Sequence, residues 1–141
     1  MAQNANAADA LVFISPAFNI KPSYNWLLAG YLGPLVSRMI FGSYREWQPI
    51  NSEQEKYWNT RYRSRALTPL TRLISWAKEI DLSKTKIPVL IFYTDNDEIV
   101  DINFVKKRFS EFGSSNKKLI KVNASNHVLA GEITSPETIL S

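Results

Sequence analysis

Four carboxylates and the only histidine of the chain follow two strand-like runs of sequence. Asp95, Asp97, Glu98 and Asp101 come directly after the apolar run IPVLIFY, and His127 comes shortly after the run KLIKV. Neighbouring parallel strands place the loops at their carboxyl ends side by side. A carboxylate in one loop can then accept the Nδ1 proton of an imidazole in the next, which fixes the tautomer and leaves Nε2 available as a base. The spacing therefore predicts a carboxylate–histidine pair.

Three short apolar runs, at residues 10–15, 87–93 and 118–122, are the elements that would position this pair. The first two are continuously apolar, which is typical of strands covered on both faces in a parallel sheet. Between the second and third runs, residues 102–112 carry phenylalanine and valine near helical spacing. The order strand, helix, strand predicts a β-α-β unit with a right-handed crossover.

The ends of the expected helix carry their own signals. Asp101 precedes its first turn and is a candidate N-cap, because an Asp side chain accepts hydrogen bonds from the free N–H groups there. Gly113 follows its last turn and is a candidate C-cap, because glycine readily adopts the left-handed backbone that often ends a helix.

Residues 16–86 separate the first two expected strands and are too many for a simple crossover. Three segments have helical patterns: residues 24–41, with a kink expected at Pro34, then 53–62 and 69–80. A long apolar insertion at the end of a parallel strand favours a lid over a site. A helical layer that only packs the core is the alternative.

Composition limits the classes of function. The chain has 141 residues, the size of one domain, with 17 Lys and Arg against 13 Asp and Glu. These basic residues are scattered, which argues against a nucleic-acid partner. Cysteine is absent, which excludes disulfides and thiolate ligands and is typical of a cytoplasmic protein. With a single histidine and no paired-ligand spacing, we expect no metal and no cofactor.

Neither the start of the chain nor its most apolar segment has a membrane signal. The run WLLAGYLGPLVSRMIFG is interrupted by glycine, proline and arginine and is shorter than the roughly 20 apolar residues a spanning helix needs. The start, MAQNANAADA, lacks the basic and apolar regions of a signal peptide and has instead the composition of the last turns of a helix. We therefore expect no membrane anchor.

Two stretches resemble a known family. IPVLIFYTDNDEIVD, followed after a helix and a strand by NASNHVLAGE, is similar to the C-terminal portion of α/β-hydrolases, in particular the lidded group of monoglyceride lipases, lysophospholipases and serine-aminopeptidase-like esterases. LVFISPAF resembles the strand that leads into the lid of that group. The resemblance implies about three parallel strands with flanking helices and a helical lid insertion. Residues 1–15 and 87–141 would form part of the α/β-hydrolase core, and residues 16–86 the lid.

The resemblance also implies roles for individual residues. The catalytic acid of the family falls on Asp97, which is followed by an apolar pair, and the catalytic histidine falls on His127. Thr94 stands where the family usually has glycine in this turn. The remaining acids, Asp95, Glu98 and Asp101, are interpreted as solvated turn charges, with Asp101 also the candidate N-cap.

The family's nucleophile motif, G-x-S-x-G, is absent from these 141 residues. In the family's order of serine, acid and histidine, the nucleophile and one oxyanion-hole loop would lie upstream of Met1. We therefore expect a C-terminal fragment that is inactive alone. SPETILS is similar to the start of a final helix.

The leading interpretation is the acid, base and lid portion of a serine hydrolase that cleaves a small-molecule acyl ester or amide. A non-catalytic binding or interaction module is the alternative, and a flavodoxin-like or nucleotide domain is disfavoured because no glycine-rich phosphate loop opens a helix. The edge of the first strand would be unpaired, so self-association is expected.

Overall fold

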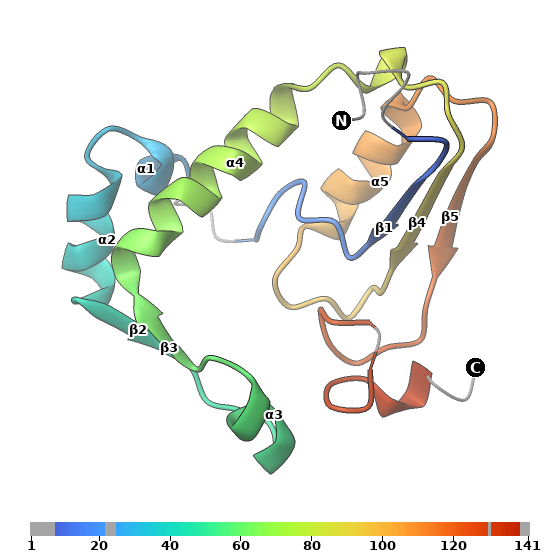
Figure 1. Cartoon of the computed structure of the whole chain (residues 1–141). Helices are drawn as coiled ribbons and strands as arrows, with labels where there is room; N and C mark the ends of the chain where they lie inside the picture. Colours follow the sequence, from blue (N-terminus) through green and yellow to red (C-terminus); the bar gives the residue numbers. More distant parts are fainter. Residues whose placement is uncertain (1–7, 22–24, 130, 139–141) are drawn as a thin grey trace. The chain divides into compact units, whose positions relative to one another are not determined.

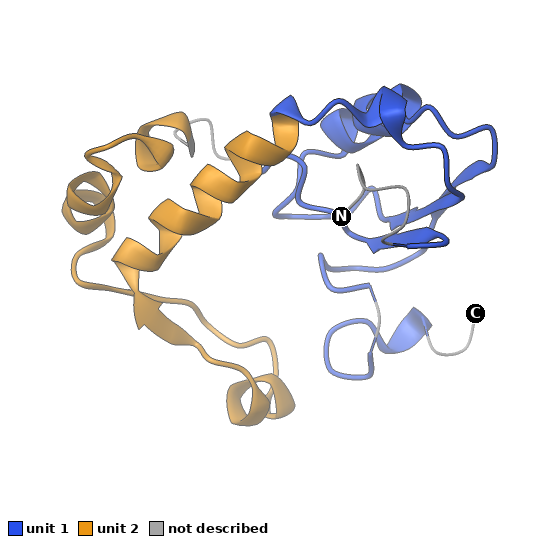
Figure 2. Ribbon diagram, turned by 45° about the horizontal axis from the view of Figure 1, so that its top comes forward, with its two compact units in different colours: residues 1–21, 79–141 blue, residues 22–78 orange. Residues whose placement is uncertain are grey.

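A computed structural model describes residues 8–21, 25–129 and 131–138 (Figure 1). The chain divides into two compact units (Figure 2). The first comprises residues 1–21 and 79–141, and the second comprises residues 22–78.

The first unit is built on a three-stranded sheet of β1 (Leu11–Ile14), β4 (Val89–Tyr93) and β5 (Lys117–Lys121). The strand order is β1-β4-β5, and both pairings are parallel (Figure 1). Phe13 lies opposite Ile91, and Ile91 opposite Leu119. The predicted parallel sheet is confirmed, with β4 at its centre.

Helix α5 (Ile102–Glu111) connects β4 to β5 and packs on the sheet. Its Val105 joins Ile91 of β4 and Val100 of the connecting loop in the core, and all three have no exposed surface. The rings of Phe13 and Phe18 lie 5.6 Å apart between centroids and form an aromatic cluster with Phe112. Apolar burial of this kind supplies most of the energy that holds the strand ends in place.

The two ends of α5 differ in how well the sequence predicted them. Asp101 is the N-cap, as predicted, and its Oδ1 accepts the N–H of Phe104 at 3.2 Å. The predicted glycine C-cap is wrong, because Gly113 does not adopt a left-handed backbone and the helix ends at Phe112 in an extended conformation. Gly113 lies against the 3₁₀ turn Leu82–Lys84, where a Cβ would be 1.9 Å from the carbonyl oxygen of Ser83. Close approach, and not backbone freedom, therefore requires glycine here.

The first strand is not covered on both faces, contrary to the prediction. Val12 is 61% exposed and Ile14 is 55% exposed, whereas their neighbours along the strand are partly buried. The apolar run predicted that both faces of this strand are covered, but none of the described residues covers the face that bears Val12 and Ile14.

The described residues of the second unit, 25–78, form four helices and one hairpin. These elements are α1 (Asn25–Ala29), α2 (Gly33–Phe41), β2 (Tyr44–Glu46), α3 (Ser52–Tyr57), β3 (Arg61–Arg63), the 3₁₀ turn Ser64–Ala66 and α4 (Leu67–Glu79). Strands β2 and β3 pair antiparallel, with Tyr44 opposite Arg63. The predicted helix at 69–80 corresponds to α4.

The other two helix predictions in this unit need correction. Residues 24–41 do not form one kinked helix, because the chain turns between α1 and α2 and Pro34 lies in the first turn of α2, where its missing N–H costs nothing. The helix predicted at 53–62 ends at Tyr57, and Arg61–Arg63 is a strand. Pairing with β2, a partner distant in sequence, overrides the local helical pattern.

The unit boundaries differ from the expected limits of the insertion. Residues 16–21 and 79–86 belong to the first unit, so the second compact unit is shorter than the interval 16–86. That the insertion acts as a lid stays a prediction. Within the described residues, no helix has the length and apolar character needed to cross a membrane.

The predicted terminal helices fall largely outside the described residues. The N-terminal helix end was expected in residues 1–10, of which 1–7 are not described. At the other end, a 3₁₀ turn occupies Pro136–Thr138, and residues 139–141 are not described.

Candidate active site

Asp97 lies in the turn that follows β4, at the carboxyl edge of the sheet. Its side chain has no exposed surface. Oδ1 accepts two backbone hydrogen bonds, from the N–H of Ile99 at 2.9 Å and from that of Val100 at 2.7 Å. Val100 is itself buried in the core, so the position of the carboxylate is tied to the packing of the sheet.

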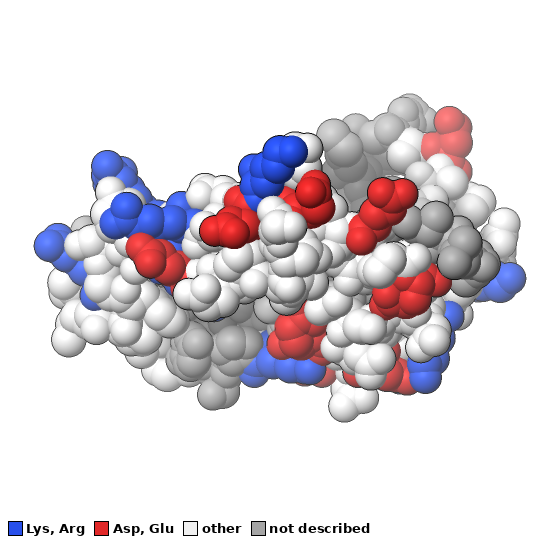
Figure 3. All heavy atoms as spheres, turned by 90° about the horizontal axis from the view of Figure 1, so that it is seen from below, with Lys and Arg blue, Asp and Glu red and all other residues white. Residues whose placement is uncertain are grey.

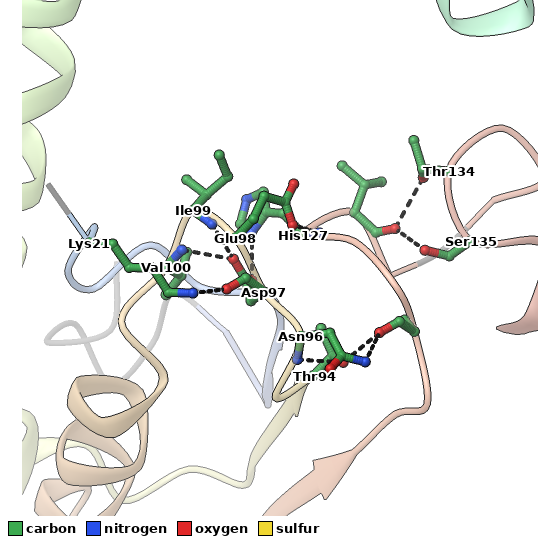
Figure 4. A network of polar contacts seen from close by, with 12 residues as sticks. Lys21, Thr94, Asn96, Asp97, Glu98, Ile99, Val100, His127, Thr134 and Ser135 are labelled. Atoms are coloured by element: carbon green, nitrogen blue, oxygen red, sulfur yellow. Dashed lines mark hydrogen bonds and ion pairs between the residues drawn. The ribbon is translucent and has the colours of Figure 1, made fainter. Parts of the chain in front are cut away.

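The second oxygen of Asp97 faces His127, which follows β5 (Figure 4). Nδ1 of His127 is 2.8 Å from Oδ2 of Asp97, so the contact predicted from the sequence is present. Since the carboxylate is the acceptor, Nδ1 carries the proton. The imidazole is 28% exposed, and no described residue is hydrogen-bonded to its Nε2. Nδ1 is therefore the ring nitrogen whose partner the described residues supply.

The contact shifts both ionisation equilibria toward the charged pair. The hydrogen bond to Asp97 raises the pKa of His127 above its ordinary value, although burial of the ring opposes this shift. Burial is the largest influence on Asp97 and would raise its pKa. The hydrogen bonds from His127, Val100 and Ile99 together outweigh it, so the pKa of Asp97 is lowered.

Thr94 joins the loop of Asp97 to the loop of His127. Its buried hydroxyl donates to the carbonyl of Ala124 at 2.7 Å, and the side chain of Asn96 donates to the same carbonyl at 3.2 Å. Thr94 has no left-handed backbone, so this turn does not require the glycine usual in the family. The threonine instead links the two loops that carry the acid and the histidine.

Two acids interpreted from the sequence as solvated turn charges have defined partners. Glu98 Oε2 accepts the backbone N–H of His127 at 2.9 Å, which holds the backbone of the histidine from the acid's own turn. Asp95 pairs with Lys121 at 2.6 Å and with Lys106 at 3.2 Å. Both acids are exposed, in agreement with the solvated interpretation, and Glu98 in addition holds the backbone of His127, which the sequence did not predict.

The segment after β1 lies alongside the turn of Asp97, which the sequence did not predict. The N–H of Lys21 donates to the carbonyl of Ile99 at 2.9 Å, and the N–H of Asp101 donates to the carbonyl of Asn19 at 3.1 Å. Nζ of Lys21 also donates to the carbonyl of Asp97 (Figure 4). Three loops at the carboxyl edge of the sheet therefore converge on Asp97.

The loop of His127 is held on its other side by the segment that follows it. The hydroxyls of Thr134 and Ser135 both donate to the carbonyl of Val128, at 3.1 and 2.8 Å (Figure 4). Asn126 donates to the carbonyl of Thr134 at 2.6 Å. These hydrogen bonds constrain the backbone on both sides of His127.

No serine among the described residues is hydrogen-bonded to His127. Ser15, at the carboxyl end of β1, has a left-handed backbone with φ 46°, and its buried hydroxyl has no partner. Backbone strain of this kind in a non-glycine residue is often found at functional sites. The Ser-Pro step was the only signal of this position in the sequence. Among the described residues, no cluster of three or more acidic or histidine side chains is arranged to hold a metal ion.

Comparison with known sequences places the chain in one family. The sequence model of the family described as serine aminopeptidase, S33, matches residues 1–134. No curated protein matches the chain in sequence.

Several solved structures share the fold. The structure described for LipS and LipT, two metagenome-derived lipolytic enzymes, superposes with a TM-score of 0.70 at 16% identity and covers 99% of this chain. A Paleococcus ferrophilus monoacylglycerol lipase gives 0.62 at 19% identity over 89%, and a soluble variant of a Saccharomyces cerevisiae monoglyceride lipase gives 0.60 at 11% over 94%. The match covers 54%, 53% and 52% of those chains, so this chain spans about half their length. At such identities the likeness shows the fold alone.

Proposed function

Since the chain belongs to the serine aminopeptidase S33 family of α/β-hydrolases, we propose that it supplies the acid, the base and the lid of a serine hydrolase. His127 would take the proton of a serine nucleophile through Nε2 and later return it to the leaving group. Asp97 would orient the imidazole and stabilise its charged form. Residues 16–86 would form the lid.

The substrate would be an acyl ester or amide with an apolar acyl group. The lipolytic enzymes that share the fold support an acyl substrate, and the apolar character of residues 24–41 supports an apolar acyl group. The nucleophile and the oxyanion-hole loop would come from polypeptide outside these 141 residues, because the chain has no G-x-S-x-G motif.

The observation that carries the proposal is the contact between His127 and a fully buried carboxylate. Burying an ionised carboxylate is costly unless its oxygens are hydrogen-bonded. In this turn Oδ1 has two backbone donors and Oδ2 has the imidazole. One oxygen of Asp97 thus fixes the acid to its own turn, and the other orients the imidazole. The outer nitrogen of the histidine is hydrogen-bonded to no described residue, and an oriented imidazole of this kind is suited to act as a general base.

A non-catalytic binding or interaction module is the second candidate. It is favoured by the absence of the nucleophile motif and by the lack of any described serine bonded to His127. The two candidates differ in what they require upstream, since only the hydrolase needs a G-x-S-x-G motif ahead of β1.

The test joins the chain to the polypeptide encoded upstream of it and measures hydrolysis of activated short-chain esters. We expect turnover that falls on the order of 10⁴-fold in Asp97→Asn and His127→Ala, because a triad loses most of its function with either member. Asp95→Asn is the matched control, since Asp95 lies in the same turn but pairs only with surface lysines.

The 141-residue chain alone provides the second arm of this test. We expect neither turnover nor labelling by a serine-directed phosphonate. Full activity of the joined protein after the His127→Ala change would rule out the hydrolase proposal. Labelling of a serine in the chain alone, with turnover that depends on His127, would show that the nucleophile is already present.

A further inference from the structure

A pocket of about 570 Å³ lies within the second compact unit. Three arginines from three different elements line it: Arg38 of α2, Arg63 of β3 and Arg65 of the 3₁₀ turn. Arg38 lies at least 25 positions before the other two in sequence, so the tertiary fold brings it to them. None of the described residues that line the pocket is acidic.

The charge of these arginines is not balanced locally. Among the described residues, no ion pair joins Arg38, Arg63 or Arg65 to an acid, whereas Glu46 is already paired with Arg61 at 2.7 Å. Residues 22–78 carry eight Lys or Arg and only three Glu. Figure 3 shows several basic side chains at the left end of the face that it draws, with an acidic side chain beside them. All three arginines are exposed, so water and salt screen their mutual repulsion, and an anion bound between them would lower it further.

The backbone that carries two of the arginines is held firmly. Ser64, between Arg63 and Arg65, is buried; its hydroxyl donates to the carbonyl of Gly42 and its N–H to the carbonyl of Ser43 at 3.2 Å. Gly42 directly follows α2, which carries Arg38. The three arginines therefore extend from a helix and a hairpin whose backbones are joined by hydrogen bonds, so a ligand would have to order only their side chains.

The rest of the lining adds hydrogen-bond donors and an apolar wall. Ser43 and Tyr44 bring hydroxyl groups, and Pro34 and Leu35 of α2 bring apolar surface. Tyr44 is opposite Arg63 in the hairpin, so both side chains project to the same face of it.

We propose that this pocket binds the phosphate group of a small organic phosphate, whose organic part rests on Pro34 and Leu35. Guanidinium groups bind phosphate oxygens through paired N–H donors, and a phosphate offers enough oxygens to engage three of them. The volume exceeds that of a phosphate ion and is within the range of small-molecule sites. This inference does not depend on the role of Asp97 and His127.

The first experiment titrates the 141-residue chain with inorganic phosphate and with sn-glycerol 3-phosphate, using glycerol as the uncharged control. Binding is followed by calorimetry and by shifts of the arginine Nε–Hε signals in NMR spectra. We expect saturable binding of both phosphates, tighter for the organic one, and none of glycerol. Absence of saturable phosphate binding up to about 10 mM, the weak end of specific affinities, would overturn the proposal.

A charge-matched pair of variants separates the pocket from general attraction of anions. Arg38→Gln/Arg65→Gln removes two positive charges from the pocket, and Arg45→Gln/Lys56→Gln removes two from elsewhere in the same unit. We expect binding at least about tenfold weaker in the first variant and within about twofold of wild type in the second. Equal weakening in both would show diffuse charge attraction and contradict the proposal.

Two further measurements complete the design. Arg65→Lys keeps the charge but loses the paired donors, so we expect an intermediate affinity; an affinity equal to wild type would contradict paired recognition. Vesicles of phosphatidylcholine with and without phosphatidic acid then distinguish the source of the phosphate. Tighter binding to the phosphatidic acid vesicles than to glycerol phosphate, lost in Arg38→Gln/Arg65→Gln alone, assigns the phosphate to a lipid headgroup. Binding to glycerol phosphate without binding to those vesicles assigns it to a soluble molecule.

Discussion

At Asp97 a charged group has been buried without losing its charge. Three donors, two of them backbone N–H groups fixed by the turn and one from His127, compensate for the lost hydration. Two of these donors persist without the histidine, so the acid is held largely by its own turn. The orientation of the His127 ring therefore depends on Asp97 more than the position of the Asp97 carboxylate depends on His127.

This asymmetry predicts the titration of the histidine. In Asp97→Asn the pKa of His127 should fall, because the amide removes the hydrogen bond and the charge that raise it. The measurement is an NMR pH titration of the imidazole signals, in which the wild-type midpoint should lie above the ordinary value near 6.5. Asp95→Asn should leave the midpoint within a few tenths of a unit. A midpoint unchanged in Asp97→Asn would contradict the observed contact.

The same pair predicts how stability depends on pH. The pKa of His127 is raised on folding, so its contribution is complete below the unfolded value near 6.5 and is lost as pH rises through the folded value. The pKa of Asp97 is lowered, so its contribution is complete above about 3.8 and is lost as pH falls through the folded value.

The ionisation of the pair therefore stabilises the fold most in the window between these two ordinary values, from about pH 4 to pH 6.5. Urea unfolding of wild type and His127→Gln at several pH values measures the difference in unfolding free energy. We expect this difference to be largest near pH 5 to 6 and smaller at pH 9. A difference that grows from pH 6 to pH 9 would contradict the direction of the shift.

At the scale of elements, two glycines allow neighbouring segments to approach so closely that a side chain would not fit between them. Gly113 lets α5 end against the 3₁₀ turn at Leu82–Lys84, and Gly33 lets α2 begin against α1. Neither has the left-handed backbone usually invoked for glycine. Gly113 therefore determines how closely the end of α5 packs on its neighbour, and Gly33 how closely the start of α2 does.

Gly33→Ala should destabilise the second unit by about 1–3 kcal/mol, since the new Cβ would lie 2.0 Å from the carbonyl oxygen of Leu28 and the backbone must shift. Gly30→Ala is the control in the same connection, because its Cβ would make only an ordinary contact at 3.5 Å. Thermal unfolding followed by tryptophan fluorescence compares the two variants. Equal melting temperatures for both would show that α1 and α2 are not packed this closely.

At the scale of the whole chain, the sheet ends at β1 with an unpaired edge and an exposed apolar face. Among the described residues, nothing pairs with the outer edge of β1, and Val12 and Ile14 project from it into solvent. Unpaired edges with apolar side chains are templates for pairing with another strand. The chain spans about half the length of the solved structures that share its fold.

We predict that the chain by itself forms dimers or larger assemblies through this edge. Sedimentation velocity at several concentrations should show mass increasing with concentration, and Val12→Lys/Ile14→Lys should shift the chain toward monomer. Ile99→Lys is the control, because Ile99 is an exposed apolar residue of the same unit away from the strand. A wild-type monomer at every concentration would refute the prediction.

Local patterns in the sequence were sufficient for the parallel sheet, for the helix between β4 and β5 and for its Asp101 cap. Strand runs and capping residues act within a few positions of themselves, so their outcome is readable from a single chain. The contact of Asp97 with His127 was also predictable, because parallel strands bring their carboxyl ends to one edge whatever the details of packing. The resemblance to the α/β-hydrolases then selected Asp97 among four neighbouring acids.

Only the tertiary structure decided which distant backbone groups those residues meet. Glu98 holds the backbone of His127, Thr94 reaches Ala124, and Lys21 lies along the turn of Asp97, each across more than 25 positions of sequence. Strand β3 took the place of the last residues of the helix predicted at 53–62 for the same reason. The pocket of arginines forms only because the fold brings that strand and the following 3₁₀ turn to α2. Such contacts depend on the three-dimensional path of the chain, which no local pattern encodes, so the residues that support the site were hidden in the sequence while the pair at its centre was not.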